Sequence, residues 1–204
     1  MATGDTDVSI CNDALVLLGS TGISSFDDGS TEAAIAAALY PNTRDLILSM
    51  YPWSFAQKKV QLQQEVAAPE FEWTYQYALP TDMLSAIRSV TNSSAVGAAS
   101  ILEWEIVGNK LMTDQTTIWV DYAYRPSESL WPSYFVQLMK YVMAWHFAEP
   151  VTDQQSKAAY WQGMAVGTPS DGGRGGFFRQ AAAIDGMGTP NNSIAGFDLL
   201  DVRA

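Results

Sequence analysis

Apolar residues recur with a helical period near the start of the chain. Their spacing predicts a first helix over Asp7–Leu18 that ends at Gly19. A second helix is predicted from a Ser30 cap to about Met50, because Pro52 disfavours the helical conformation of the residue before it. The first half of this second helix is almost entirely alanine, which allows neighbouring helices to approach closely.

The helical period returns after residue 130. One stripe of this third helix contains Phe135, Leu138, Met139, Val142, Met143 and His146. Pro150 is predicted to stop this helix, and residues 152–155 read as a capping box that opens a fourth helix. The fourth helix is predicted to run to about Val166, with Gly167 as its stop.

Between Lys58 and Tyr124 the pattern changes to alternation of apolar and polar residues, which is typical of strands with one buried face. The apolar positions of this region are Val60, Leu62, Trp73, Tyr75, Tyr77, Leu79, Ile87, Val90, Leu102, Trp104, Ile106, Ile118, Val120, Tyr122 and Tyr124. Gly108-Asn109 fits a two-residue hairpin turn that needs positive φ. An antiparallel sheet inserted between two helical halves is therefore predicted.

These elements predict an α+β protein, built as a four-helix bundle with an inserted antiparallel β-sheet lobe and an extended C-terminal arm. The predicted units are residues 1–56 with 129–167 for the bundle, 57–128 for the lobe and 168–204 for the arm. Gly172–Gly176 reads as a flexible run, and the apolar residues beyond it would be wasteful in a merely disordered tail. We expect the arm to dock on a neighbouring subunit; the alternative is a frayed terminus.

The composition favours a protein that forms interfaces with partner proteins. Charged residues are only 16% of the chain and aromatic residues are 12%, which suits buried interfaces, although a monomer with a large core is the alternative. The net charge of −11 disfavours gripping nucleic acid, because an acidic surface repels phosphates. A single cysteine, Cys11, excludes an internal disulfide and fits assembly in a reducing cytoplasm. No apolar run is long enough to cross a bilayer, so no membrane partner is expected.

The residue types that support catalysis are sparse. The lone histidine, His146, lies on an apolar helical stripe, and Cys11 lies on the packed face of the first helix, so both are interpreted as core residues. The close carboxylate pairs are Asp27-Asp28, Glu70 with Glu72, and Glu103 with Glu105, which could suit a metal or glycosidic chemistry but occupy positions typical of solvated charge. The sequence therefore predicts no enzyme activity, no cofactor and no metal site.

Arginines are scarce and their positions suggest ion pairs within or between subunits, in preference to nucleic-acid contacts. Arg44 and Asp45 are adjacent in a helix and point about 100° apart, so they are not expected to pair with each other. Arg125 follows a strand and precedes Pro126, which fixes its direction. The residues predicted at subunit or partner interfaces are Arg44, Asp45, Trp53, Arg125, Arg174, Phe177, Phe178 and Arg179.

The order of several short motifs resembles the tail tubular protein A family of short-tailed bacteriophages. The matching segments, in chain order, are residues 10–15, 17–19, 26–30, 40–45, 52–56, 75–82, 104–108, 111–114, 122–125 and 148–152. Among them, Tyr40-Pro41-Asn42-Thr43-Arg44-Asp45 and Pro52-Trp53-Ser54-Phe55-Ala56 are the most specific. Together the segments cover residues near 8 to 165, and the pattern fades after about Val166.

This resemblance implies a structural virion protein, a head-to-tail adaptor between the portal and the tail nozzle. Such proteins form a ring of typically about twelve copies below the portal vertex, so the implied partners are further copies of the chain, the portal protein and the nozzle protein. Genomic DNA would pass through the channel without specific binding during ejection. Two alternatives stay open: a virion-associated hydrolase that also plugs the channel, and a binding module that recognises a peptide at a sheet edge.

Overall fold

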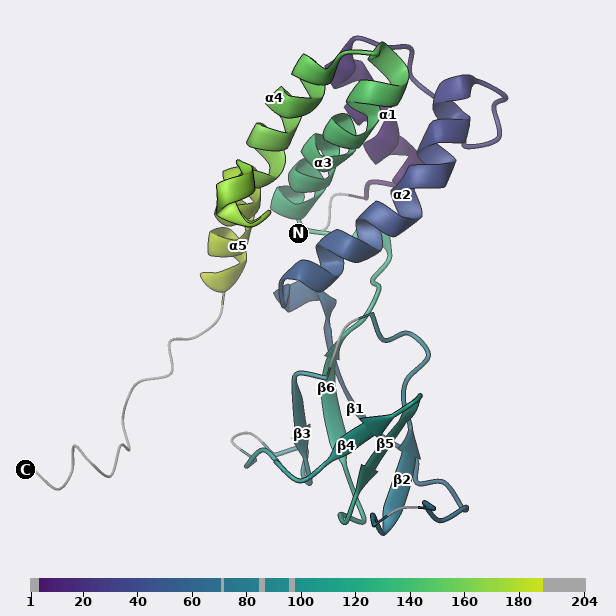
Figure 1. The fold of residues 1–204 in the computed structure, drawn as a ribbon, viewed down its shortest axis with the longest axis vertical. Helices are drawn as coiled ribbons and strands as arrows, with labels where there is room; N and C mark the ends of the chain where they lie inside the picture. Colours follow the sequence, from purple (N-terminus) through teal and green to yellow (C-terminus); the bar gives the residue numbers. More distant parts are fainter. Residues whose placement is uncertain (1–3, 71, 85–86, 96–97, 189–204) are drawn as a thin grey trace, which may run out of the picture.

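The computed structural model describes residues 4–70, 72–84, 87–95 and 98–188. Over these residues the fold is mixed α+β, with five α-helices and two small antiparallel three-stranded sheets. The helices gather in one part of the molecule and the strands in another (Figure 1). The helices are α1 (Asp7–Leu18), α2 (Thr31–Met50), α3 (Ser133–Thr152), α4 (Gln155–Val166) and α5 (Gly176–Gly186). The strands are β1 (Gln57–Gln61), β2 (Tyr75–Ala78), β3 (Ser89–Thr91), β4 (Glu105–Val107), β5 (Lys110–Thr113) and β6 (Trp119–Ala123).

The first two helices confirm the bounds that the sequence predicts. Ser30 caps α2 by accepting a hydrogen bond from the Ala33 amide at 3.1 Å, which satisfies one of the free donors of the first turn. Gly19 ends α1 in the left-handed conformation. Tyr51 leaves α2 with extended backbone angles immediately before Pro52.

The boundary between α3 and α4 differs from the prediction. Pro150 does not stop α3; it lies in the last turn, where the helix continues to Thr152 and ends at Asp153 with φ of 53°. The predicted capping box is also wrong, because Thr152 is the last residue of α3, and its hydroxyl donates to the carbonyl of Ala148 at 2.5 Å. Gln154 precedes α4 without a side-chain cap, while Gly167 ends α4 as predicted.

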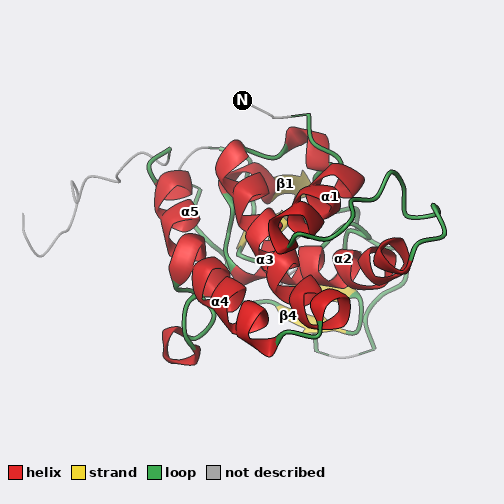
Figure 2. Ribbon diagram, turned by 90° about the horizontal axis from the view of Figure 1, so that it is seen from above, coloured by secondary structure: helices red, strands yellow, loops and turns green. Residues whose placement is uncertain are grey.

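The helices share one hydrophobic core around α3. This helix packs against α1, α2, α4 and α5, and Figure 2 shows it surrounded by them. Its large residues Phe135, Leu138 and Phe147 are fully buried. Removal of such side chains from water stabilises the fold by about 1.5–3 kcal/mol each.

The strands form two sheets, where the sequence predicts one. Their orders are β1-β6-β3 and β2-β5-β4, and all pairs are antiparallel. A small second core between them contains Tyr77, Val90, Leu111 and Val120. Two sheets are needed because short twisted strands bury an apolar face only against a second layer. The hairpin at Gly108-Asn109 is confirmed, with Val107 opposite Lys110 and Gly108 at φ of 64°.

Part of the predicted extended arm is helical. Residues 176–186 form α5, which packs on α3 and α4 and buries Phe178 and Ala181 in the helical core. Its amphipathic spacing buries positions 178, 181 and 185, which explains why this segment folds back on its own chain. The remainder of the predicted arm, residues 189–204, lies outside the described residues, and so do the apolar residues expected there, Phe197, Leu199 and Leu200.

The glycine-rich run Gly172–Gly176 forms the turn that leads into α5. Gly176 has φ of +49°, and a Cβ there would lie 2.7 Å from the carbonyl oxygens of both Gly163 and Met164. These neighbours are backbone atoms of α4, which cannot move aside without breaking the helix. Glycine at 176 is therefore required for α5 to pack on α4.

Gly176→Ala should lower the free energy of unfolding by about 2 kcal/mol or more, because it adds a steric clash to a strained backbone conformation. Gly163→Ala is the matched control, since its Cβ would meet nothing within 4 Å and it lies inside α4. That control should raise stability by about 0.5–1 kcal/mol. Urea unfolding followed by tryptophan fluorescence measures both, and equal midpoints for the two variants would refute the close packing.

Candidate functional site at the junction of helices and strands

Four charged side chains join α2 to the segment that follows β6. Arg44 donates from Nη1 to Glu128 Oε1 at 3.0 Å and from Nε to Asp45 Oδ1 at 3.0 Å. Arg125 donates from Nε to the same Asp45 oxygen at 2.8 Å and from Nη2 to Asp45 Oδ2. The hydroxyl of Tyr40 completes this charge network by donating to Glu128 Oε1 at 3.1 Å.

The charge network corrects the prediction that Arg44 and Asp45 do not pair. Adjacent residues diverge on a helix, but the long arginine side chain curls back so that its Nε reaches the neighbouring carboxylate. Arg44 also reaches Glu128 on the short 3₁₀ helix Glu128–Leu130. Both Arg44 and Asp45 are thus engaged within their own subunit.

Burial strengthens the charge network. The side chains of Arg44 and Glu128 are only 15% and 18% exposed, so solvent screens their attraction weakly. Burial lowers the pKa of Arg44, but hydrogen bonds to Asp45 and Glu128 outweigh this effect and the pKa is raised. Burial and the negative charge of Glu128 raise the pKa of Tyr40 well above its ordinary value. Arg44 stays ionised and Tyr40 neutral near pH 7.

Trp53, which follows the end of α2, sits at the centre of an aromatic cluster. Its ring centroid lies 4.8 Å from that of Tyr51, 5.0 Å from Phe135 and 5.4 Å from Phe178. Its indole N–H donates to the carbonyl of Ile47 at 3.0 Å, which ties the end of α2 to the core. Trp53 is 0% exposed and Phe178 is 1% exposed, so the prediction that they face another chain is wrong for both.

A buried carboxylate that sequence reasoning missed fixes α5 to this cluster. Asp185 accepts hydrogen bonds from the Ser54 amide at 2.9 Å, the Ser54 hydroxyl at 2.7 Å and the Tyr134 hydroxyl at 2.5 Å. Asp185 is 5% exposed, and these three donors replace the water that it loses. Its spacing of seven residues from Phe178 is the helical signal that could have revealed it.

The remaining predicted interface residues lie near α5. Arg174 and Arg179 are exposed, and Phe177 is half-buried with its ring 5.4 Å from that of Tyr141. Arg125 is partly exposed, with 47% of its side chain accessible. Of the eight predicted residues, the structure brings Arg44, Asp45 and Arg125 into one ion-pair network, and Trp53 and Phe178 into ring contact.

The groups considered for catalysis do not converge over the described residues. His146 stacks on Trp145 with ring centroids 4.4 Å apart, and burial lowers its pKa. Cys11 is buried, and burial raises the pKa of its thiol, so the reactive thiolate is disfavoured. In the same described ranges, no three His, Cys, Asp or Glu residues come together in an arrangement that could hold a metal ion. None of the helices in the described part of the chain combines the length and the apolar character needed to span a membrane.

No family model matches this chain, and no curated protein shows significant sequence similarity to it.

Arg44→Ala should lower the free energy of unfolding by about 2 kcal/mol, because it leaves the shielded Glu128 without its cation. The matched control is Lys58→Ala, which breaks the 2.8 Å pair with Asp82 whose side chains are 46% and 41% exposed. An exposed pair contributes about 0–1 kcal/mol, so the control should change stability little. Urea unfolding of both variants is the measurement; equal losses would show that the charge network is no stronger than a surface pair.

Stability should fall as the pH rises above the ordinary tyrosine pKa of about 10. The folded protein holds Tyr40 protonated where the unfolded chain has lost the proton, so the stabilisation is complete below that pH and is lost above it. Each tyrosine whose pKa is raised by folding makes the free energy of unfolding fall by at most about 1.4 kcal/mol per pH unit in this range. Tyr40→Phe should make the slope shallower in urea unfolding between about pH 9 and about pH 11. Tyr77, Tyr122 and Tyr134 also have raised pKa values, so part of the slope should persist. A slope unchanged by Tyr40→Phe contradicts this assignment.

Proposed function

We propose that this chain is a structural subunit of a virion, a head-to-tail adaptor that forms a ring between the portal and the tail nozzle. In this proposal α1 to α4 are the four-helix bundle, and the strands are a lobe inserted into it. The resemblance of its motifs to the tail tubular protein A family supports the proposal. The charge network adds support, because the motif residues Tyr40, Arg44, Asp45 and Arg125 meet in space although about 80 positions separate the two segments.

The observation that carries the proposal is the wide distribution of exposed apolar side chains. A ring subunit needs two different complementary patches, one for each neighbour, and further surfaces for the partners above and below. Exposed apolar side chains occur on α1 at Val16 and Leu17, on α4 at Tyr160 and Met164, and near β4 at Leu102, Ile106 and Val107. Side chains of this kind on both the helical and the strand part suit a subunit that has partners on several sides.

The charge of the chain suits the wall of a DNA channel. With 22 acidic and 11 basic residues, a ring of many copies repels the phosphate backbone. Weak adhesion lets the double helix slide during ejection, whereas a basic wall would grip it. DNA is thus a passing partner in this proposal and not a bound ligand.

A second candidate function, recognition of a peptide at a sheet edge, is favoured by β4. This strand is at the edge of the β2-β5-β4 sheet, and all three of its residues are exposed. Natural proteins usually protect such edges, because the free backbone groups pair readily with another strand. An incoming strand could come from a partner in the tail or from another protein.

Light scattering coupled to size-exclusion chromatography tests the proposal on the full chain. We expect a mass near that of about twelve chains of 22.3 kDa, or a mass that rises with concentration toward that value. Leu102→Ser should shift the assembly toward smaller species, because Leu102 is 88% exposed in the single subunit. Its unfolding midpoint should match that of the wild type, which separates a lost interface from a damaged fold. The mass of a single chain at every concentration contradicts the adaptor ring.

A further inference from the structure

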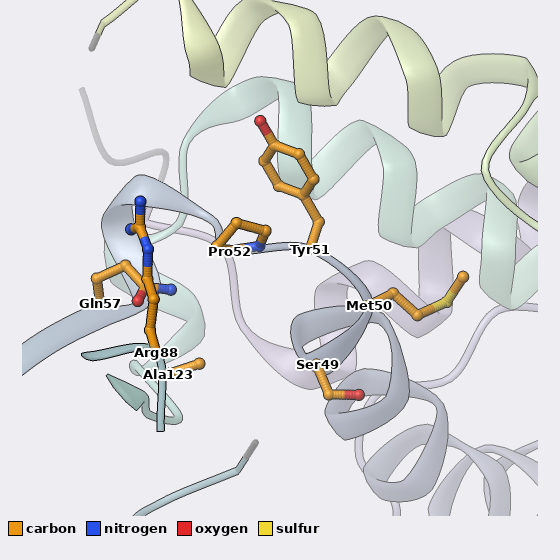
Figure 3. A pocket seen from close by; sticks show the side chains of 7 residues that line it. All are labelled: Ser49, Met50, Tyr51, Pro52, Gln57, Arg88 and Ala123. Atoms are coloured by element: carbon orange, nitrogen blue, oxygen red, sulfur yellow. The ribbon is translucent and has the colours of Figure 1, made fainter. Parts of the chain in front are cut away.

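A pocket of about 250 Å³ lies where the end of α2 meets the strands (Figure 3). It is lined by Ser49, Met50, Tyr51, Pro52, Gln57, Arg88 and Ala123. Its volume is below the roughly 300–1,000 Å³ of sites for drug-sized molecules and cofactors. The pocket is therefore suited to a single side chain of a partner.

Two hydrogen-bond donors in this pocket lack a side-chain partner among the described residues. The side-chain nitrogen of Gln57 is buried and makes no hydrogen bond to any of them, which is rare for a buried polar group. Arg88 forms no ion pair within the described part of the chain, although acidic residues outnumber basic ones two to one. No carboxylate is among the lining residues, and Met50, Pro52 and Ala123 supply apolar walls.

The chemistry of the pocket selects a carboxylate. A carboxylate accepts hydrogen bonds only, and an arginine fork together with an amide N–H₂ group matches its two oxygens. Arg88 is itself exposed, and Met50, Pro52 and Ala123 add apolar surface to the same pocket. An acidic side chain beside an apolar one fits both features.

The loop that precedes α2 carries such a group. Asp27 and Asp28 are exposed there, next to the half-buried Phe26, and neither forms an ion pair among the described residues. Hydrogen bonds from Ser30, with a further one from the Ser24 amide, lower the pKa of Asp28 and keep its carboxylate ionised. This carboxylate pair, whose spacing could suit a metal or glycosidic chemistry, lies at the surface of the structure.

The loop and the pocket lie at opposite ends of the same helix. The loop precedes α2 at Thr31, and the pocket begins where α2 ends at Met50 (Figure 1). A helix of 20 residues is about 30 Å long, so the loop cannot reach the pocket of its own chain. A second copy can supply the loop, and a contact between two different surfaces of identical chains is the kind that closes a ring.

We propose that the Arg88–Gln57 pocket receives the Asp27-Asp28 loop of a neighbouring copy of this chain. This contact rests on the proposed function, since it is the junction through which the ring closes. Each subunit gives its loop to one neighbour and receives a loop from the other.

Complementation between two full-length variants tests this contact by light scattering. Arg88→Gln keeps the loop intact and disables the pocket. The double variant Asp27→Asn with Asp28→Asn keeps the pocket intact and disables the loop. Each variant alone should need at least about tenfold higher concentration than the wild type to reach half-assembly. An equal mixture should form two-chain species at concentrations where each variant alone is a single chain. Lys59→Gln removes the same charge from β1 without lining the pocket, and it should assemble like the wild type.

The outcomes separate the contact from the ring. If the wild type assembles and Arg88→Gln assembles equally well, the contact is wrong and the adaptor ring stands. If the wild type stays a single chain, the adaptor ring fails, and a labelled peptide with the sequence of residues 24–30 then decides the contact by fluorescence anisotropy. Binding of this peptide to the wild type that weakens about tenfold with Arg88→Gln supports the pocket. No binding, or equal binding to both proteins, overturns it.

Discussion

The charge network of Arg44, Glu128, Asp45 and Arg125 is the constraint on which the arrangement of this molecule depends. Helices and strands have separate hydrophobic cores, so little apolar packing fixes one part against the other. The chain crosses from the helices to the strands near Trp53 and returns to the helices near Arg125. The charge network ties this second crossing to α2. Partly buried ion pairs are directional, whereas apolar contacts tolerate sliding. Loss of the network would therefore change the angle between the two parts before it unfolded either of them.

The aromatic cluster and Asp185 extend this control to the end of the described chain. Trp53 connects α2 to α3 and α5 through ring contacts, and Asp185 holds α5 by hydrogen bonds to Ser54 and Tyr134. Residues of α3 and α5 thus meet at the turn where α2 gives way to β1. A chain built in this way presents surfaces of fixed geometry, which the proposed ring would require of each member.

The sequence predicts the local elements well and their three-dimensional partners less well. The bounds of α1 and α2 and the hairpin at Gly108 follow from local rules of capping, proline restriction and glycine conformation. Pro150 is tolerated because it falls in the last turn of α3. Whether a proline falls there depends on where the helix ends. The division of the strands into two sheets and the partners of Arg44 depend on contacts between residues far apart in the chain. The burial of Trp53 and Phe178 was hidden for the same reason, since an aromatic residue suits a core and an interface equally.

We propose that this protein acts by shape, as one member of a closed ring with a channel wide enough for DNA. Single-particle electron cryomicroscopy of the purified full-length chain tests it most directly. We expect closed rings of identical subunits, with the charge network inside each subunit and the exposed apolar residues of α1, α4 or β4 covered by neighbours. Isolated particles of one chain, or open aggregates without rotational symmetry, would contradict it.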